Sequence, residues 1–371
     1  MTDAIDLPGR EPSIVQVVLH RVAVRLVEAR AAAHGTEQVR ESILVEVADA
    51  DGATGWGECV TLARPTYSVE WTAGAWMVLH ELLVPALLAG EHPSLVGHPM
   101  AGAALDDAIL DLRLRLAGRS LTEILSSRDR VASRAVVGIE PDLDLLEGAV
   151  SSRLVAGHRS IKLKVVPGQA AGAVERVRDR WPDLDLAIDA NGSFDLHRDE
   201  VELAALDAVG LAYLEQPLPG DDLVGLAALR RRATTPIALD ESVASLGSLV
   251  AAHELGAVDL LNLKPARFGG VRAALPVVAE MAAREIGGFV GGMYELGVGR
   301  SVALCMAASD RLADVPCDLG PSDAYVAHDI TEPFLLDGDG TIAVGSELGI
   351  SRHPDGSSLD AVTVARAELR R

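Results

Sequence analysis

Two lysines stand two residues apart in the apolar stretch "SIKLKVV", residues 160 to 166. Side chains on a strand alternate between its two faces, so Lys162 and Lys164 share one face and their apolar neighbours share the other. An exposed edge strand can carry lysines in this way as protection against pairing with other chains. The choice between an edge strand and a buried functional strand depends on the rest of the sequence.

Four more charged residues follow Lys164 at nearly equal intervals. They are Asp189, Glu215, Asp240 and Lys264, at steps of 25, 26, 25 and 24 residues. Each lies late in a short β-rich run, and a step of this size fits one strand, one helix and two turns. The series predicts one charged side chain at the end of each of five consecutive strand–helix units.

Eight β-rich runs separated by helical stretches can be found in the chain. They are 135 to 139, 161 to 166, 186 to 190, 213 to 217, 237 to 242, 260 to 266, 287 to 295 and 314 to 320. Strands that alternate with helices favour a parallel sheet, and eight of them with seven connecting helices predict an α/β fold, a (β/α)7β modified TIM barrel. Active sites in such barrels lie at the carboxyl ends of the strands, where the charged series would converge. Because a closed barrel has no edge strand, the edge-strand interpretation of Lys162 and Lys164 is disfavoured.

The sequence before the barrel has a different pattern. Residues 15 to 29 and 41 to 60 alternate like antiparallel strands, with Asp51-Gly52 as a turn signal, and helical stretches follow at 71 to 89 and 100 to 118. We expect an N-terminal α+β capping domain at 1–128 and a barrel domain at 129–328. A C-terminal segment at 329–371, with a hairpin-like "FLLDGDGTIAV", is expected to return to the capping domain and complete it.

Charge and composition exclude several classes of protein. The chain of 371 residues has 54 acidic and 33 basic residues and a net charge of −21, so nucleic acids and anionic membranes would be repelled. The amino end has no apolar signal region, and no run of eighteen apolar residues follows, so we expect a soluble, cytoplasmic protein. Cys59, Cys305 and Cys317 form no CxxC pair, which argues against a disulfide framework or a cysteine metal site.

The three acids of the series make a hard, all-oxygen ligand set. Asp189, Glu215 and Asp240 would repel one another unless a cation lay between them, and oxygen ligands of this kind suit Mg²⁺, with Mn²⁺ as the alternative ion. Lys164 precedes the acids by one strand and Lys264 follows them by one. The lysines would therefore stand on opposite sides of the metal.

This arrangement suggests removal of a proton from carbon on one face and its return on the other. A lysine in a water-poor mouth beside another cation has a lowered pKa and can act as a base, and Lys162 would supply that neighbouring charge to Lys164. General acid–base catalysis gives only ~10²–10⁴-fold, too little for a proton next to a carboxylate. The metal would supply several kcal/mol more by stabilising the enediolate.

Several short motifs carry a resemblance to a known family. They are "KLK" at 162 to 164, "DAN" at 189 to 191, "EQP" at 215 to 217, "DES" at 240 to 242, "NLKPAR" at 262 to 267 and "GGMYELGVGR" at 291 to 300. Together the motifs resemble the enolase superfamily, muconate-lactonizing subgroup, and within it the o-succinylbenzoate synthase / N-succinylamino acid racemase family. The resemblance extends from about residue 15 to about residue 350.

The resemblance implies a role for each matching residue. Asp189, Glu215 and Asp240 would bind Mg²⁺, and Lys164 and Lys264 would be the acid–base pair. Residues that would contact the substrate are Lys162, Asn191, Gly291, Gly292, Met293 and Glu295, the 291 to 293 stretch lining a pocket for a distal acyl group. Two capping loops, near 28 to 36 and 59 to 67, would close over the site. The partner would be a small-molecule carboxylate, and we expect a homo-oligomer.

Two departures from the family pattern affect the substrate rather than the chemistry. The first capping loop reads "EARAAAHG", residues 28 to 35, and has no aromatic residue. Leu296 stands where the family often has a threonine. The sequence leaves racemisation of an N-acylamino acid and dehydration to o-succinylbenzoate both open.

Two other kinds of protein share parts of this pattern. A cycloisomerase or a dipeptide epimerase remains an alternative, although a dipeptide epimerase would want an acidic pair near Asp318, and glycine stands two positions on. A non-catalytic relative that binds a small acid would be expected to have lost a lysine or an acid, and none is lost. Arg267 could equally contact substrate or form a salt bridge at the barrel rim.

Overall fold

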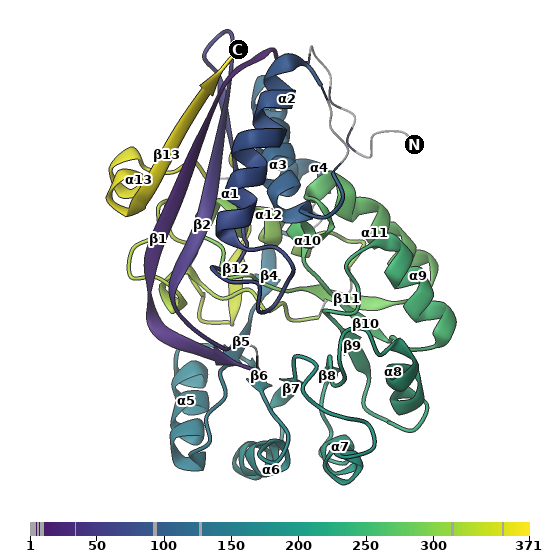
Figure 1. Cartoon of the computed structure of the whole chain (residues 1–371). Coiled ribbons are helices and arrows are strands. Elements are labelled where there is room, and N and C mark those ends of the chain that lie inside the picture. Colours follow the sequence, from purple (N-terminus) through teal and green to yellow (C-terminus); the bar gives the residue numbers. More distant parts are fainter. Residues whose placement is uncertain are drawn as a thin grey trace.

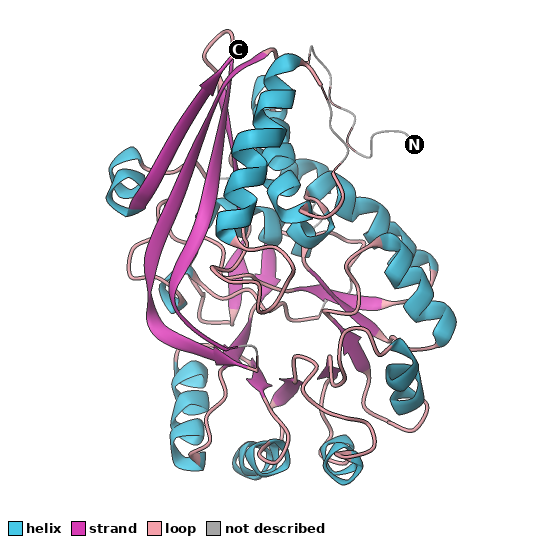
Figure 2. Ribbon diagram, in the orientation of Figure 1, coloured by secondary structure: helices cyan, strands magenta, loops and turns pink. Residues whose placement is uncertain are grey.

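The structure is a computed structural model, and it describes residues 5, 7, 11–33, 35–91, 95–125, 128–312, 315–350 and 352–371. It has two parts (Figure 1). A barrel of parallel strands is ringed by helices, and a tall antiparallel sheet with helices against one face stands over the barrel (Figure 2). The predicted α/β class with a capping unit is therefore confirmed.

Seven parallel strands form most of the barrel wall and run in chain order around it. They are β5 (Arg134–Val137), β6 (Ser160–Lys164), β7 (Asp185–Asp189), β8 (Leu214–Glu215), β9 (Ile237–Leu239), β10 (Leu260–Leu263) and β11 (Gly287–Val290). Parallel bridges from Cys317 to Ser133 and from Asp318 to Gly291 join the two ends of this sheet. The eighth predicted strand thus lies between β11 and β5 as expected, while residue 314 falls outside the described residues.

Helices cover the outside of the barrel (Figure 2). They are α5 (Leu143–Val155), α6 (Ala170–Arg180), α7 (Glu200–Asp207), α8 (Leu223–Arg230), α9 (Leu246–Leu255), α10 (Pro265–Phe268), α11 (Val271–Ala283) and α12 (Gly297–Ala307). Local sequence sets several of their ends. Ser245 caps α9 through the N–H of Ser248, and Gly256 ends the same helix in the left-handed conformation that glycine adopts easily.

The capping unit is a four-stranded antiparallel sheet in the order β13-β1-β2-β3. Its strands are β1 (Ile14–Ala32), β2 (Gly35–Asp49), β3 (Thr54–Cys59) and β13 (Thr363–Arg370), and its helical segments are α1 (Thr72–Val78), η1 (Leu79–Leu83), α2 (Val84–Ala89), α3 (Pro99–Leu116) and α4 (Leu121–Leu125). Helix α3 packs closely against β3 at Gly57. A Cβ on this residue would come 2.0 Å from the carbonyl oxygen of Ala104. Only glycine allows this approach.

The C-terminal segment contacts both parts. After η2 (Ser322–Ala324), β12 (Thr341–Ala343) pairs with β4 (Arg130–Ala132), which lies next to β5 in the chain. Strand β13, which follows α13 (Gly356–Val362), pairs with β1 in the capping sheet. The predicted hairpin around residue 340 therefore contacts β4, and it is the last strand of the chain that returns to the cap.

The first capping loop was expected near residues 28 to 36 and is mostly strand. Strand β1 continues to Ala32 and β2 begins at Gly35, so the segment is the end of a long hairpin, with residue 34 outside the described residues. The carbonyl of Ala31 accepts a hydrogen bond from Ile139 N at 3.3 Å. The segment is thus mostly strand rather than loop, but it lies at the site as expected, since Ala31 lines the pocket.

One helical stretch in the described residues, Thr72–Ala89, is long and apolar enough to cross a membrane by length and composition alone. Its mean hydropathy is 1.5 and 39% of it is buried. Its buried side chains, among them Ala75, Leu79 and Val84, pack in one hydrophobic cluster with β1 and β2. Core helices of soluble proteins pass the same test, so the stretch is weak evidence for a membrane.

Candidate active site

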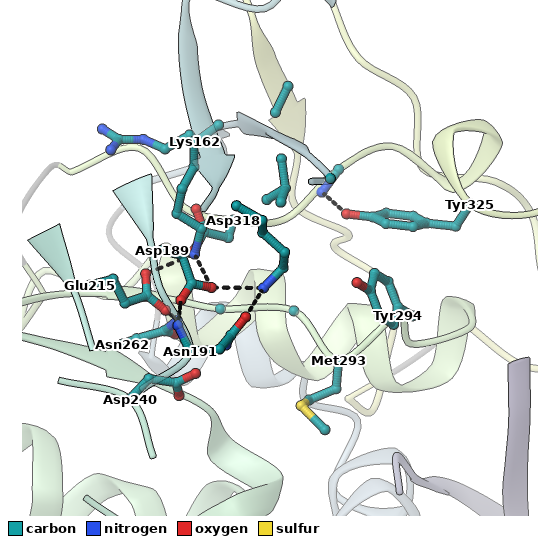
Figure 3. Close-up of a pocket in the computed structure, with 18 of the residues that line it drawn as sticks. Lys162, Asp189, Asn191, Glu215, Asp240, Asn262, Met293, Tyr294, Asp318 and Tyr325 are labelled. Atoms are coloured by element: carbon teal, nitrogen blue, oxygen red, sulfur yellow. Dashed lines mark hydrogen bonds and ion pairs between the residues drawn. The ribbon is translucent and has the colours of Figure 1, made fainter. Parts of the chain in front are cut away.

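The predicted charged series does converge at one mouth of the barrel. In the parallel register Lys164 lies beside Asp189, and Asp189 lies beside Glu215. Asp240 and Lys264 follow directly after β9 and β10 and line the same pocket. Figure 3 shows the acids and Lys162 pointing toward one another from neighbouring strands.

Lys164 is held by two side chains of the next strand and its turn. Its Nζ donates to Asp189 Oδ2 at 2.8 Å and to Asn191 Oδ1 at 2.7 Å. Burial alone would lower the pKa of Lys164, but the charge of Asp189 outweighs it and raises the pKa above its usual value. Lys162 does lower the pKa of Lys164, as expected, but Asp189 contributes more, so the net pKa is raised and the expectation of a lowered pKa was wrong.

Lys162 is buried and fully engaged with acids. Its Nζ donates to Glu215 Oε2 at 2.7 Å and makes a shorter contact with Asp318 Oδ2. Burial lowers the pKa of this lysine, yet Asp318 and Glu215 together hold it well above its ordinary value. Lys162 thus serves as a fixed positive charge between Glu215 and the eighth strand.

Lys264 stands on the far side of the acids with a different set of partners. Its Nζ donates to Asp240 Oδ2 at 2.7 Å and contacts the hydroxyl of Tyr67. Tyr67 lies in the second capping segment, 59 to 67, and its hydroxyl donates to Asp240 at 2.7 Å. Arg267 forms a buried 2.6 Å ion pair with Asp240, so it makes the salt bridge that was one of its two predicted roles.

The three acids are buried, and each is paired with an ammonium or guanidinium group. Burial raises the pKa of Glu215 to about 8. Lys162 lowers this pKa, while the negative charges of Asp189, Asp318 and Asp240 raise it further. Arg267 and Lys264 hold the pKa of Asp240 well below its usual range despite burial. Across the described residues, no three His, Cys, Asp or Glu side chains lie close enough together to form a ready-made metal site.

The stretch 291 to 295 forms part of the pocket wall. Gly291, Gly292 and Met293 line the pocket, as predicted. A Cβ on Gly291 would fall 2.0 Å from Asn262 Oδ1, so glycine is required for packing. Glu295 is not among the residues that line the pocket, and its carboxylate accepts a 2.7 Å hydrogen bond from Met293 N instead.

Sequence reasoning missed several residues of the site. Asn262 donates to Glu215 Oε1 at 2.7 Å, and its position two residues before Lys264 in the same β-rich run could have indicated it. Asp318 lies late in the eighth β-rich run, as the five charged residues do in theirs, but the sequence indicated it only in connection with a dipeptide epimerase. Tyr67 lies in the second capping loop that was expected to close over the site, but no local spacing indicated its contact with Asp240, which joins residues 173 apart in the chain. Glu241 accepts a hydrogen bond from Asn191 Nδ2 at 2.9 Å, and burial raises its pKa to about 7.

The lysine content of the chain adds a further observation. The sequence contains 33 basic residues, of which only Lys162, Lys164 and Lys264 are lysine. All three line the one pocket, and every other basic residue is arginine. Arginine can replace lysine as a surface cation but cannot release its proton in the physiological range. The side chains in this chain that could serve as amine bases are thus confined to this pocket.

Comparison with known proteins identifies the family. Residues 145–358 match the family model described as enolase C-terminal domain-like. The chain belongs to the enolase superfamily. An N-succinylamino acid racemase of an Amycolatopsis species is 41% identical over 362 residues, covering 94% of this chain and 97% of that protein. An o-succinylbenzoate synthase of Geobacillus kaustophilus is 35% identical over 362 residues, covering 95% and 96%. The predicted family and its enzymatic nature are therefore confirmed.

Solved structures of the enolase superfamily have the same fold. A member from Listeria innocua has a TM-score of 0.90 at 29% identity and covers 96% of this chain and 99% of its own. A dipeptide epimerase from Cytophaga hutchinsonii, solved with Mg and the dipeptide D-Ala-L-Val, has a TM-score of 0.86 over the same shares. Its identity is 21%, so this second likeness concerns the fold alone.

Proposed function

We propose that this protein removes the proton α to the carboxylate of an N-acylamino acid, with Mg²⁺ as cofactor, and returns a proton on either face. The product is the racemised amino acid derivative. The same residues would serve the dehydration that yields o-succinylbenzoate, in which one lysine is the base and the other stabilises the intermediate. Both activities are carried by similar proteins, an N-succinylamino acid racemase and an o-succinylbenzoate synthase.

The observation that carries this proposal is the placement of the lysines. Lys164 and Lys264 lie on opposite sides of three acids, and the chain has no lysine outside this pocket. Racemisation needs one proton acceptor on each face of the α-carbon, each of which can also donate. Two amines in these places meet that need, whereas arginines would not.

The acids fit a divalent cation in their chemistry. Asp189, Glu215 and Asp240 offer only carboxylate oxygens, which Mg²⁺ prefers. Their mutual repulsion persists beside the lysines, since the other acids still raise the pKa of Glu215. The Oδ1 atom of Asp318 and the Oε2 atom of Glu241 are also buried without a hydrogen-bond partner among the described residues. An excess of buried negative charge and orphaned oxygens favours binding of a cation here.

The residues of this chain would divide the work as follows. The three acids would hold Mg²⁺, which when bound supplies Lewis-acid stabilisation of the negative charge on the substrate carboxylate. A cation beside Asp189 would offset the effect of this acid on Lys164 and lower the pKa of that amine. Lys162, as a fixed charge, would help to orient the carboxylate. Lys164 and Lys264 would each take or return the α-proton on their own side.

The alternatives receive less support. A dipeptide epimerase would need a free acid to bind the substrate ammonium, and Asp318 is engaged by Lys162. A cycloisomerase has the same lysines and acids, and no contact in the pocket favours it. The cytoplasmic location and the homo-oligomer remain predictions of the sequence.

Deuterium exchange tests the proposal. The protein would be incubated in heavy water with Mg²⁺ and N-succinyl or other N-acyl amino acids, and the α-proton signal followed by ¹H NMR. We expect loss of that signal and of optical rotation, both stopped by EDTA and restored by Mg²⁺. The substrate of the dehydration is included in the same panel. If the protein turns over no member of the panel, the proposed function is refuted.

A further inference from the structure

Glu241 is a carboxylate at the edge of the site, and apart from its negative charge the proposed chemistry gives it no role. It follows Asp240 directly at the end of β9, yet the two side chains have different partners. Asp240 is bound by Lys264 and Arg267. Glu241 Oε1 instead accepts a hydrogen bond from Asn191 Nδ2 at 2.9 Å, after β7, on the other side of the acids.

Asn191 connects Glu241 with a lysine. Its Oδ1 accepts from Lys164 Nζ at 2.7 Å, and its backbone N donates to Asp189 Oδ1 at 2.9 Å. The backbone of Asn191 has a φ of 44°, in the left-handed region that asparagine adopts more readily than most other residues with a side chain. The side-chain amide of Asn191 is therefore held between Lys164 and Glu241 from a compact turn after β7.

The two ends of the Asn191 amide are distinguished by the charges beside them. A carboxylate can only accept hydrogen bonds and an ammonium can only donate them. Glu241 therefore takes the NH₂ end of the amide, and the oxygen end is directed at Lys164. Without the carboxylate, the amide could turn over and present its NH₂ group to the ammonium, which would repel it.

Lys264 is held in a way that does not involve this chain of contacts. Its Nζ is bound by Asp240 and by the hydroxyl of Tyr67. Lys164 is bound by Asp189 and Asn191. Glu241 acts on Lys264 through its charge, but no hydrogen bond or ion pair joins these two described side chains. Loss of the Glu241 side chain should therefore displace Lys164, while Asp240 and Tyr67 keep Lys264 in place.

We propose that Glu241 is a positioning residue for Lys164, acting through the side-chain amide of Asn191. The inference rests on the proposed function, in which Lys164 and Lys264 act on opposite faces of the α-carbon. It predicts a one-sided defect. The enantiomer whose proton Lys164 removes should be affected, and the enantiomer served by Lys264 should not.

Enantiomer-resolved exchange is the first test. Glu241→Ala and Glu241→Gln would be incubated in heavy water with Mg²⁺ and either enantiomer of N-succinylphenylalanine. The enantiomer served by Lys164 is identified as the one that a Lys264→Ala variant still exchanges. We expect its exchange to fall on the order of 10²-fold in Glu241→Ala, the usual cost of a misplaced catalytic group, while the other enantiomer exchanges near the parent rate. Glu241→Gln, whose carbonyl oxygen can still accept from Asn191, should restore most of the loss.

The lysine content of the chain supplies a second test that needs no substrate. Protein labelled with ¹³C at lysine Cε should give three signals, each assigned by substitution of one lysine. Glu241→Gln removes the same charge as Glu241→Ala and keeps the acceptor for Asn191, so the two variants are compared with each other. Between them we expect the signal of Lys164 to differ and that of Lys264 to stay. Glu254→Ala is the matched control, since this exposed glutamate on α9 pairs with Arg284 and should leave both readouts unchanged.

Three results would overturn the inference. Equal loss of exchange for both enantiomers, or a difference between the two variants in the Lys264 signal as well as the Lys164 signal, would show that Glu241 supports the whole site. Loss of thermal stabilisation by Mg²⁺ in both Glu241 variants would make Glu241 a metal ligand instead. If the parent protein exchanges neither enantiomer, the proposed function fails, and the lysine signals alone then decide the role of Glu241.

Discussion

Lysine differs from arginine in that its surroundings can lower its pKa enough for it to act as a base, whereas a guanidinium group keeps its proton. Replacing Lys164 or Lys264 by arginine keeps the positive charge beside the acids and removes the base. We expect Lys164→Arg and Lys264→Arg to abolish racemisation as completely as the alanine variants do, with a loss of at least ~10²-fold. Polarimetry on an N-succinylamino acid measures the effect.

Lys164→Ala and Lys264→Ala should differ in which enantiomer of the substrate exchanges its α-proton. Lys164→Ala should still exchange the α-proton of one enantiomer in heavy water, and Lys264→Ala that of the other, because each retains one base. The pair controls for misfolding, since each variant keeps an activity that the other lacks. Racemisation at the parent rate in either variant would show that the two-base assignment is wrong.

Gly291 illustrates how a residue without a side chain fixes an acid. Because an added Cβ would lie 2.0 Å from Asn262 Oδ1, Gly291→Ala should displace Asn262 from Glu215. We expect a loss of ~1–3 kcal/mol in the free energy of unfolding, the usual cost of overpacking, together with slower exchange of both enantiomers.

Urea unfolding measures the effect of Gly291→Ala, and Gly148→Ala is the matched control. Gly148 lies within α5 with no atom near its added Cβ, so alanine there should stabilise the protein by ~0.5–1 kcal/mol. If Gly291→Ala is as stable and active as the parent, the wall formed by 291 to 293 is not tightly packed.

At the level of elements, two neighbouring aspartates on α3 join the capping unit to α11 in different ways. Asp107 is buried, and its Oδ1 accepts from Val271 N, the first residue of α11, at 2.9 Å. Asp106 forms a more exposed ion pair with Arg272. Burial, with a smaller contribution from Asp106, raises the pKa of Asp107 to about 8.

The raised pKa of Asp107 makes stability depend on pH in a defined direction. The folded protein keeps the proton of Asp107 up to about pH 8, whereas the unfolded chain loses it near pH 4, so stability should fall as pH rises between these values. Asp107→Asn keeps an oxygen for Val271 N and removes the titration. We expect the stability of Asp107→Asn relative to the parent to rise between pH 5 and pH 8, by up to ~1.4 kcal/mol per pH unit.

Urea unfolding at several pH values checks this expectation, and two further variants bracket it. Asp107→Ala also removes the cap of α11 and should cost ~1–2 kcal/mol at pH 5. Asp106→Asn should change the unfolding free energy by less than ~1 kcal/mol, since its ion pair is partly exposed. A constant difference between Asp107→Asn and the parent would mean that Asp107 is ionised throughout this range.

The sequence allowed the barrel and most of its site to be predicted because both follow from local repetition. A charged residue every 24 to 26 positions, late in apolar runs, requires only the strand–helix unit to be placed correctly. The contacts of Tyr67 could not be predicted in this way, because they depend on how the capping unit packs against the barrel and not on local spacing in the sequence. The long β1–β2 hairpin was missed for a related reason, since its extension beyond the cap depends on the barrel against which it lies.

At the level of the whole molecule, the charge of the chain complicates any measurement of metal binding. A net charge of −21 destabilises the compact state by self-repulsion, and any salt relieves part of it. A rise in Tm with Mg²⁺ is therefore not specific by itself. A bound ion differs from a screening ion in requiring particular carboxylates and in saturating.

We expect Mg²⁺ to raise Tm beyond the effect of NaCl at the same ionic strength. An ion that binds only the folded state stabilises it by ~2.7 kcal/mol at a concentration of one hundred times its Kd. Glu215→Gln keeps the size of the side chain and its place beside Lys162, so it should retain the response to NaCl and lose the additional response to Mg²⁺. Differential scanning calorimetry on both proteins separates the two contributions. Two results would contradict this expectation: the same Mg²⁺ response in Glu215→Gln as in the parent, or a response of the parent to Mg²⁺ no larger than that to NaCl. Either result would mean that Glu215 does not bind the metal. A bound cation would then no longer explain why three buried acids lie together at this mouth of the barrel.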